Sequence, residues 1–260
     1  MENMKITAMS YNLRYDTGEG GVARMHALVS QINHYSPDIF GVQEETPAWK
    51  GFFSVHLNPK YARVGEGRRG ASDQRESNEA AAVYFDTQKF ELLHTVTKWL
   101  SATPDVPSYI EGAHFPRSVT FAVLKYRANG NKLVFANTHF DCSTDAIREE
   151  ESRCLSRIRH DFGDLPFIIS GDFNSQPNSP AYNLVCEDGL QDVSLVAPDS
   201  KIDNTFHGYG KMGVIIDYFF ANEKIKPLTY RVLSEKWNGE YTSDHYPITV
   251  CFDIENKIGG

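Results

Sequence analysis

The sequence predicts an α+β fold in which mostly antiparallel β-sheets carry a few helices on their outer faces. Strand-like segments outnumber helical ones and are often neighbours along the chain, which favours antiparallel pairing. The chain has 260 residues, of which 41% are hydrophobic and 12% aromatic, enough for a large core. No internal repeat, low-complexity tract or linker interrupts it, so residues 1–260 are expected to form a single domain.

The predicted elements follow from hydrophobic periodicity and from turn residues. Short apolar or alternating runs predict strands over 5–12, 38–44, 80–85, 90–99, 119–126, 132–140, a run ending near Gly171, 214–221, 228–234 and 247–253. Helical spacing of apolar residues predicts helices over 22–34, from 144 or 145 to about 160, and over 179–186. Residues 58–79 are rich in Gly, Arg and Ser and are expected to form a loop, and 128–131 a hairpin turn.

The charge balance restricts the partners of the protein. There are 26 Lys and Arg residues against 34 Asp and Glu residues, a formal net charge of -8. An acidic protein does not attract polyanions over its whole surface, so a phosphate-bearing substrate would need a local basic patch or a bound metal ion. This balance weighs against an enzyme acting on duplex DNA.

Cysteine usage and the first residues indicate the compartment. The four cysteines (Cys142, Cys154, Cys186 and Cys251) form no Cys-x-x-Cys pair, so free thiols in a reducing compartment are expected rather than disulfides. The first 15 residues lack the basic and apolar regions of a secretion signal, although a signal removed beforehand would leave no trace. No run approaches the ~20 apolar residues of a membrane span. A cytoplasmic protein without membrane insertion is therefore expected.

One segment predicts a functional site most directly: the apolar run at 168–169 that continues as Gly171-Asp172-Phe173-Asn174. Side chains alternate along an extended chain, so residues two apart point the same way. Asp172 and Asn174 are therefore expected to reach one point in space if the strand geometry continues.

Five further segments place a carboxylate, an amide or a histidine at the end of a predicted strand, before one or within one. These residues are Asn12, Glu44, His139, Asp217 and the pair Asp244-His245. Alone, Asn12 could simply end a strand, Glu44 could be a rim carboxylate and His139 a structural histidine. Asp217 lies within an apolar run, where an unpaired charge would cost several kcal/mol, so it needs a donor such as a histidine.

The chemistry of this set favours a hard metal ion. Carboxylate oxygens of Glu44, Asp172 and Asp244, with Asn12 and Asn174 as neutral partners, suit Mg²⁺, for which Mn²⁺ is the expected substitute. A histidine paired with a carboxylate can act as a base or bind phosphate. The sequence contains no Gly-x-Ser-x-Gly motif and no Gly-x-x-x-x-Gly-Lys loop. Metal-assisted hydrolysis of a phosphate ester is therefore the predicted reaction.

Taken in order, these motifs resemble the endonuclease/exonuclease/phosphatase superfamily, also called deoxyribonuclease I-like. The resemblance extends from Ser10-Tyr11-Asn12 to Ser243-Asp244-His245-Tyr246-Pro247. It implies a four-layer α/β/β/α sandwich of two sheets packed face to face, with the site at one sheet edge. The motif around 171–177 is most similar to the deadenylase-related branch and its uncharacterised bacterial relatives, and the motif at 204–208 is also similar to that bacterial group.

The resemblance also implies a role for each site residue. Glu44 would be the main metal ligand, supported by Asn12 and Asp244. Asp172 would orient or deprotonate the attacking water beside Asn174, and His245, paired with Asp217, would be a base or phosphate-binding group. His139 would contact the phosphate or protonate the leaving group, and Glu79, which precedes the strand at 80–85, would pair with His139; a plain loop charge is the alternative for Glu79.

Arginines are candidates for substrate binding. Arg68 and Arg69 lie in the predicted loop, and Arg117 directly precedes a strand. Guanidinium groups bind phosphates through two parallel hydrogen bonds, so one or two of these residues are expected to bind a second phosphate or the distal part of the substrate. The alternative for any one of them is a solvated loop residue.

The predicted function is a divalent-metal-dependent phosphodiesterase that acts on single-stranded nucleic acid or a small phosphorylated molecule. The first alternative is a phosphomonoesterase for a sugar, inositol or lipid head-group phosphate at the same site. A more remote alternative is a binding module that keeps the scaffold without catalysis, but the complete set of carboxylates and histidines argues against it.

Overall fold

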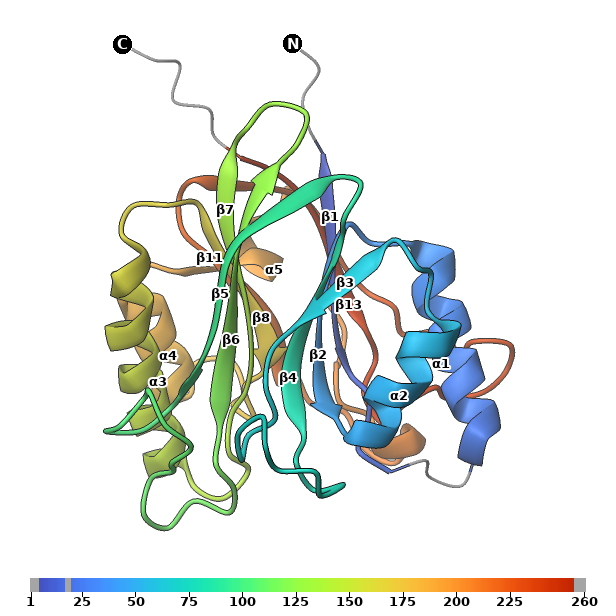
Figure 1. The fold of residues 1–260 in the computed structure, drawn as a ribbon, viewed down its shortest axis with the longest axis horizontal. Helices are drawn as coiled ribbons and strands as arrows, with labels where there is room; N and C mark the ends of the chain where they lie inside the picture. Colours follow the sequence, from blue (N-terminus) through green and yellow to red (C-terminus); the bar gives the residue numbers. More distant parts are fainter. Residues whose placement is uncertain (1–4, 17–19, 255–260) are drawn as a thin grey trace.

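The computed structural model describes residues 5–16 and 20–254, and two β-sheets form its centre (Figure 1). Among the described residues the first sheet has seven strands, in the order β10 (Asp199–Lys201), β12 (Ile225–Val232), β13 (Ile248–Ile254), β1 (Ile6–Asn12), β2 (Ile39–Glu45), β4 (Ala80–Asp86) and β3 (Tyr61–Val64). The second has six, in the order β5 (Phe90–Trp99), β6 (Ser118–Tyr126), β7 (Lys132–His139), β8 (Phe167–Asp172), β11 (Asp217–Ala221) and β9 (Gln191–Asp192).

Most neighbouring strands are antiparallel, as predicted. The parallel pairs in the described chain are β1 with β2, β7 with β8, and β10 with β12. The connection between β1 and β2 is the helix α1 (Gly21–Tyr35), and the connection between β7 and β8 contains α3 (Asp145–Arg159). Because parallel strands share an orientation, each of these two pairs brings two strand C-termini to one edge of its sheet.

Helices cover the outer face of each sheet (Figure 1). On the first sheet α1 and α2 (Pro47–His56) pack over β1, β2 and β4, with side chains such as Leu28, Trp49 and Phe53 in one buried cluster. On the second, α3 and α4 (Pro180–Glu187) pack over β6, β7 and β8. A third apolar cluster lies between the sheets. The predicted four-layer α/β/β/α sandwich is confirmed.

A buried polar layer also joins the two sheets. Gln43 Nε2 donates to Ser10 Oγ at 3.0 Å and to Asn137 Oδ1 at 2.7 Å, and Ser170 Oγ donates to the same oxygen at 3.1 Å. Gly41 leaves room for these groups, since a Cβ there would lie 2.4 Å from Ser170 Oγ. Hydrogen bonds between specific partners fix the relative register of the sheets next to the strand ends that carry the site.

The predicted loop over 58–79 is wrong in part, because 61–64 form the edge strand β3, which is half-buried and pairs with β4. The helix α2 was not predicted, although Thr46 and Pro47 are typical of a helix start. The Thr46 side chain accepts the N–H of Trp49 at 3.3 Å. Apolar periodicity alone misses elements this short, as it does for β9, α5 (Val193–Val196) and β10.

Two strand boundaries also differ. The strand expected from 214 begins at Asp217, because Val214 pairs instead with Phe206 in an isolated bridge. The strand expected over 228–234 is β12, which begins at Ile225. All four cysteines have free thiols, as predicted. Within 5–16 and 20–254, no helix has the length and apolar character to cross a membrane.

Candidate active site

Five of the predicted site residues lie where strands of both sheets end or begin. His139 and Asp172 close the parallel strands β7 and β8 and are register partners. Asp217 opens β11, which is antiparallel to β8, so it faces Asp172 across the ladder. Asn12 ends β1 and Glu44 lies next to the end of β2. The sheet topology therefore brings these side chains to one edge of the sandwich, as the sequence predicts.

A histidine and two carboxylates form the centre of this edge. His245 Nδ1 lies 2.9 Å from Asp217 Oδ2, and His245 Nε2 lies 3.7 Å from Asp172 Oδ2. All three side chains are buried. The Asp217 N–H donates to Thr205 Oγ1 at 3.0 Å, and the Phe206 ring lies 4.8 Å from the His245 ring. The predicted need of Asp217 for a histidine partner is thus met, and the segment at 205–206 supports the pair.

The histidine on β7 approaches the same carboxylate oxygen of Asp172. His139 Nε2 lies 3.6 Å from Asp172 Oδ2 and 3.3 Å from Asn174 Nδ2. Asn174 Nδ2 also donates to the Phe140 carbonyl at 2.9 Å, and this bond fixes which end of the amide faces His139. Asp172, Asn174 and His139 therefore meet as predicted.

The route by which Asn174 reaches Asp172 differs from the expectation. The strand ends at Asp172, and Asn174 has a left-handed φ of 47°, so the alternation of side chains does not continue. Instead the Asn174 N–H donates to Asp172 Oδ1 at 2.9 Å in a tight turn. Asn tolerates this conformation better than most residues, which explains the residue type.

Asn12 connects two acidic residues of the site. Its Nδ2 donates to Asp172 Oδ2 at 3.0 Å and to Glu44 Oε1 at 3.1 Å, and its Oδ1 accepts the Arg14 N–H at 2.9 Å. Glu44 has a φ of 60° at an irregularity in the β2–β4 ladder and accepts the Tyr15 N–H at 2.7 Å. A non-glycine residue in this conformation costs energy and is often found at functional sites.

Asp244 has a partner that sequence reasoning missed. Its Oδ2 pairs with the guanidinium of Arg14, and its Oδ1 accepts the Ser243 hydroxyl at 3.3 Å. Arg14 follows Asn12 by two residues, so the signal was a charged residue close to the first site residue. The same side chain also pairs with Asp16, where Arg14 Nε lies 3.2 Å from Oδ1.

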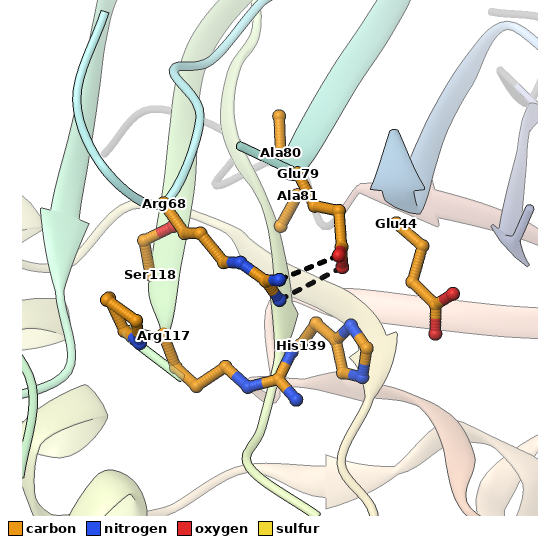
Figure 2. Close-up of a pocket in the computed structure, with 9 residues that line it drawn as sticks. Glu44, Arg68, Glu79, Ala80, Ala81, Arg117, Ser118 and His139 are labelled. Carbon is orange, nitrogen blue, oxygen red and sulfur yellow. Dashed lines mark hydrogen bonds and ion pairs between the residues drawn. The ribbon is translucent and has the colours of Figure 1, made fainter. Parts of the chain in front are cut away.

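A pocket extends from the carboxylates toward the arginines (Figure 2). Glu44, Arg68, Glu79, Ala80, Ala81, Pro116, Arg117, Ser118 and His139 line it. Arg68 and Arg117 are both buried, and their guanidinium carbons lie 4.2 and 5.3 Å from the centre of the Phe115 ring. Arg69 is not one of the described residues that line this pocket, so only two of the three predicted arginines meet here.

The expected pair of Glu79 with His139 is not formed. Both carboxylate oxygens of Glu79 accept from Arg68, at 3.0 and 2.7 Å, as the dashed lines in Figure 2 show. A buried guanidinium matches a carboxylate through two parallel bonds and binds it better than a neutral imidazole does. His139 is instead bonded to Asn174.

The surroundings separate the protonation states of the site residues. Burial and the neighbouring Asp217 carboxylate raise the pKa of Asp172 to about 7. Burial alone would lower the pKa of His245, but the carboxylates of Asp217, Asp172 and Asp244 raise it to about 10. Burial, with Arg117, Arg68 and His245 nearby, lowers the pKa of His139 well below 6.5. His245 is therefore charged and His139 neutral at neutral pH.

The donor set suits a hard divalent cation. Glu44 and Asp172 present carboxylate oxygens, the ligand type that Mg²⁺ prefers, and Asn12 Nδ2 joins the two carboxylates by donating to both. Burial, and after it the Asp217 carboxylate, raises the pKa of Asp172, and a cation bound nearby would favour the charged carboxylate. The Asp172, Asp217 and His245 donor atoms also lie within 4.8 Å of one another.

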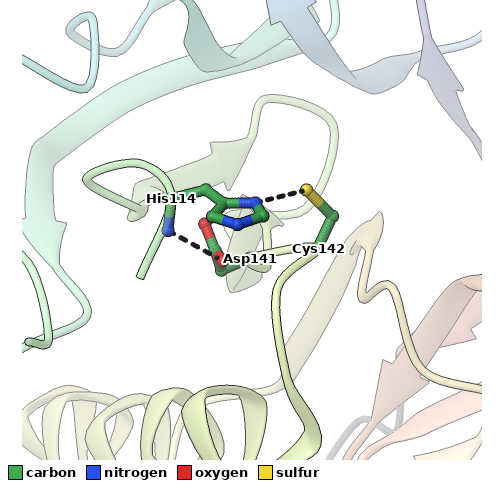
Figure 3. Close-up of side chains that lie close together, drawn as sticks. All are labelled: His114, Asp141 and Cys142. Atoms are coloured by element: carbon green, nitrogen blue, oxygen red, sulfur yellow. Dashed lines mark hydrogen bonds between the residues drawn. The ribbon is translucent and has the colours of Figure 1, made fainter. Parts of the chain in front are cut away.

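A second group of ligand-type residues lies at His114, Asp141 and Cys142 (Figure 3). Asp141 is buried, and its two oxygens accept the N–H groups of His114, Ser143 and Phe115 at 2.9–3.1 Å and Arg117 Nε at 3.4 Å. These bonds occupy the lone pairs that a metal would need. Asp141 thus braces the loop that carries Arg117.

The comparisons with known proteins agree with this geometry. Residues 9–245 match the model of the Endonuclease/Exonuclease/phosphatase family. The chain therefore belongs to this family, whose members are phosphoesterases and nucleases. Nocturnin of Drosophila melanogaster is 24% identical over 251 residues, which span 89% of this chain and 37% of that protein. The protein angel of Drosophila melanogaster is 25% identical over 262 residues, spanning 89% of this chain and 72% of angel.

Solved structures resemble nearly the full length of the chain. An endonuclease/exonuclease/phosphatase from Bacteroides vulgatus has a TM-score of 0.89 at 25% identity and covers 97% of this chain and 100% of its own. A mannosyl-6-phosphatase from Bacteroides thetaiotaomicron has a TM-score of 0.87 at 27% identity, covering 95% and 99%. The human Nocturnin catalytic domain with a bound sulfate has a TM-score of 0.75 at 17% identity, with 96% and 94% covered, a likeness of fold alone.

Proposed function

We propose that this protein hydrolyses a phosphate ester with a divalent cation, Mg²⁺ or its substitute Mn²⁺, and that Asp172 activates the attacking water. The arrangement around Asp172 Oδ2 carries the proposal: Asn12 Nδ2 lies 3.0 Å away, His139 Nε2 3.6 Å and His245 Nε2 3.7 Å. A carboxyl group whose pKa is about 7 can accept a proton from water at neutral pH.

The other residues have complementary roles in this mechanism. His245, kept charged by Asp217, binds a phosphoryl oxygen, and Asn174 keeps Asp172 and His139 in place. Neutral His139 contacts the phosphoryl or leaving oxygen without supplying a proton. Glu44 and Asn12 would hold the cation, which neutralises the phosphoryl oxygens and the leaving oxygen when bound. Asp244 lies beside His245 and is paired with Arg14.

The direct test is hydrolysis of bis-p-nitrophenyl phosphate with Mg²⁺ or Mn²⁺. Addition of EDTA should abolish turnover, and Asp172→Asn should lower kcat by ~10²–10⁴-fold because the base is lost. Asp188→Asn is the matched control, since Asp188 also pairs with a histidine, His160 at 3.0 Å, but lies outside the site. Full turnover in EDTA, or by Asp172→Asn, contradicts the mechanism.

A phosphomonoesterase for a small molecule is the second candidate. The pocket beside Glu44 and His139 supports it, because Arg68 and Arg117 are buried there and can bind the extra charge of a monoester or a second phosphate. The similarity to a mannosyl-6-phosphatase also supports it. A panel of oligo(A), bis-p-nitrophenyl phosphate, p-nitrophenyl phosphate and mannose 6-phosphate distinguishes the two candidates by their kcat/KM values.

A further inference from the structure

Arg14 forms an ion pair with Asp244 and supplies a positive charge next to its carboxylate. Its guanidinium bonds Asp244 Oδ2 on one side and Asp16 on the other, where Nε lies 3.2 Å from Oδ1. The Asp244 side chain is 8% exposed and that of Arg14 34% exposed, so this ion pair is largely shielded from water on the carboxylate side. Partial burial strengthens the pairing of such charges over that of a surface pair.

The guanidinium is held in place from several directions. The rings of Tyr15 and Tyr209 each lie 5.8 Å from its central carbon. The backbone of Arg14 has a left-handed φ of 58°, its N–H donates to Asn12 Oδ1 at 2.9 Å, and its carbonyl accepts Trp49 Nε1 at 3.0 Å. A residue fixed in this way is not a freely moving surface arginine.

The segment that carries Arg14 and Tyr15 divides the acidic residues of the site into two groups. The Tyr15 N–H donates to Glu44 Oε2 at 2.7 Å, while Glu44 Oε1 faces Asn12. Asp244 instead faces Arg14 and the Ser243 hydroxyl. A divalent cation bound directly to Asp244 would have to displace the guanidinium or lie against it, and like charges at that separation repel.

We infer that Arg14 takes the place of a second metal ion. The site then binds one divalent cation, on the Glu44 side, and the guanidinium supplies the positive charge on the Asp244 side, next to His245. The inference rests on the proposed metal-dependent phosphoesterase and deepens it by fixing how many ions the site holds. It makes Arg14 a positioning residue that keeps Asp244 out of the metal's coordination.

Metal stoichiometry tests this inference without measuring activity. Mn²⁺ is titrated into the full chain and followed by calorimetry and by the EPR signal of free Mn²⁺. The wild type should bind one ion, and Arg14→Gln should bind two, because Asp244 and Asp16 then lose the guanidinium that forms a direct ion pair with each of them. The double variant R14Q/D244N should return to one ion. Arg75→Gln is the matched control, since Arg75 pairs with Asp73 on an exposed loop, and it should bind one ion.

The outcomes separate the inference from the proposed function. Two ions on the wild type, or one on folded Arg14→Gln, overturn the inference alone; no ion on the wild type contradicts the proposed metal dependence instead. If Arg14→Gln does not fold, Arg14→Lys and R14Q/D244N decide. Each should bind one ion with a Kd within about threefold of the wild type, and a Kd about tenfold weaker for R14Q/D244N would make Asp244 a direct ligand.

Discussion

At the scale of single residues, environment rather than residue type separates the protonation states of the two site histidines. His245 has an Asp217 oxygen 2.9 Å from Nδ1, whereas His139 has Arg68 and Arg117 as charged neighbours. The first environment raises the pKa of the imidazole and the second, after burial, lowers it. The sequence left both as possible acids or bases; their surroundings keep His245 charged and His139 neutral, and the proposed roles rest on this difference.

His245→Ala should lower kcat by ~10²–10⁴-fold, because the variant loses the charged group next to Asp172. Steady-state kinetics with bis-p-nitrophenyl phosphate measures the loss, and circular dichroism checks the fold. His160→Ala is the matched control, since His160 also pairs with an aspartate but is exposed. If His245→Ala unfolds instead, His245 is structural and its proposed role is wrong.

The arginine pocket predicts a change in KM. The double substitution R68Q/E79Q removes the Arg68–Glu79 pair without leaving a buried carboxylate unpaired. KM for a sugar bisphosphate should rise ~10-fold, about the effect of losing one charge-assisted hydrogen bond, with kcat changed less. Arg69→Gln should leave KM unchanged, because Arg69 does not line the pocket. An unaltered KM for R68Q/E79Q would remove Arg68 from substrate binding.

At the scale of elements, α3 supports the site through one buried side chain. Glu151 Oε2 accepts the Asp141 N–H at 2.8 Å, and the Asp141 side chain in turn braces the loop that carries Arg117. Burial raises the pKa of Glu151 from 4.5 to about 8, so the folded protein binds this proton more tightly than the unfolded chain. The resulting stabilisation is complete below about pH 4.5 and is lost as the pH rises through about 8.

Glu151→Gln removes this pH dependence while its amide oxygen can still accept the Asp141 N–H. Relative to the wild type, the variant should gain ~1–3 kcal/mol of unfolding free energy between about pH 6 and about pH 9. Urea unfolding at the two pH values measures the difference. Glu150→Gln, on the partly exposed side of the same helix, should follow the wild type at both. Parallel behaviour of Glu151→Gln and the wild type would mean that Glu151 is ionised in the folded protein.

The helices and strands also show where local sequence patterns suffice to predict secondary structure. Long runs with clear periodicity, such as β5 over 90–99 and α3 with its Thr144 cap, were predicted within a residue or two. The short elements β3, β9 and β10 were not, since two to four residues contain too little of a period. The helix α2 was not predicted although Thr46 and Pro47 mark its start, because its 10 residues hold too few turns for a clear apolar periodicity.

At the scale of the whole molecule, the apolar layer between the sheets holds the two halves of the site together. Phe135 on β7 lies fully buried in this layer, while β7 carries His139 at its end. Phe135→Ala should lower the free energy of unfolding by ~3–5 kcal/mol, measured by urea denaturation. Leu93→Ala, at a site 40% exposed on β5, should change it by less than ~0.5 kcal/mol. Equal effects would show that Phe135 is not part of a tightly packed core.

The sequence by itself predicted the fold class, the family through the resemblance of its motifs, and most of the residues that meet at the candidate site. Strand periodicity and polar residues at strand ends are local features, so they can be read without knowledge of the partner strands. Only the tertiary structure decided which site side chains form ion pairs and hydrogen bonds with one another. Glu79 pairs with Arg68 rather than with His139, Asp244 pairs with Arg14, and Asn174 bonds to Asp172 through a turn. These pairings join residues up to 230 positions apart and depend on distance, burial and charge after the sheets have packed. The order of residues along the chain does not contain these distances, burials and local charges.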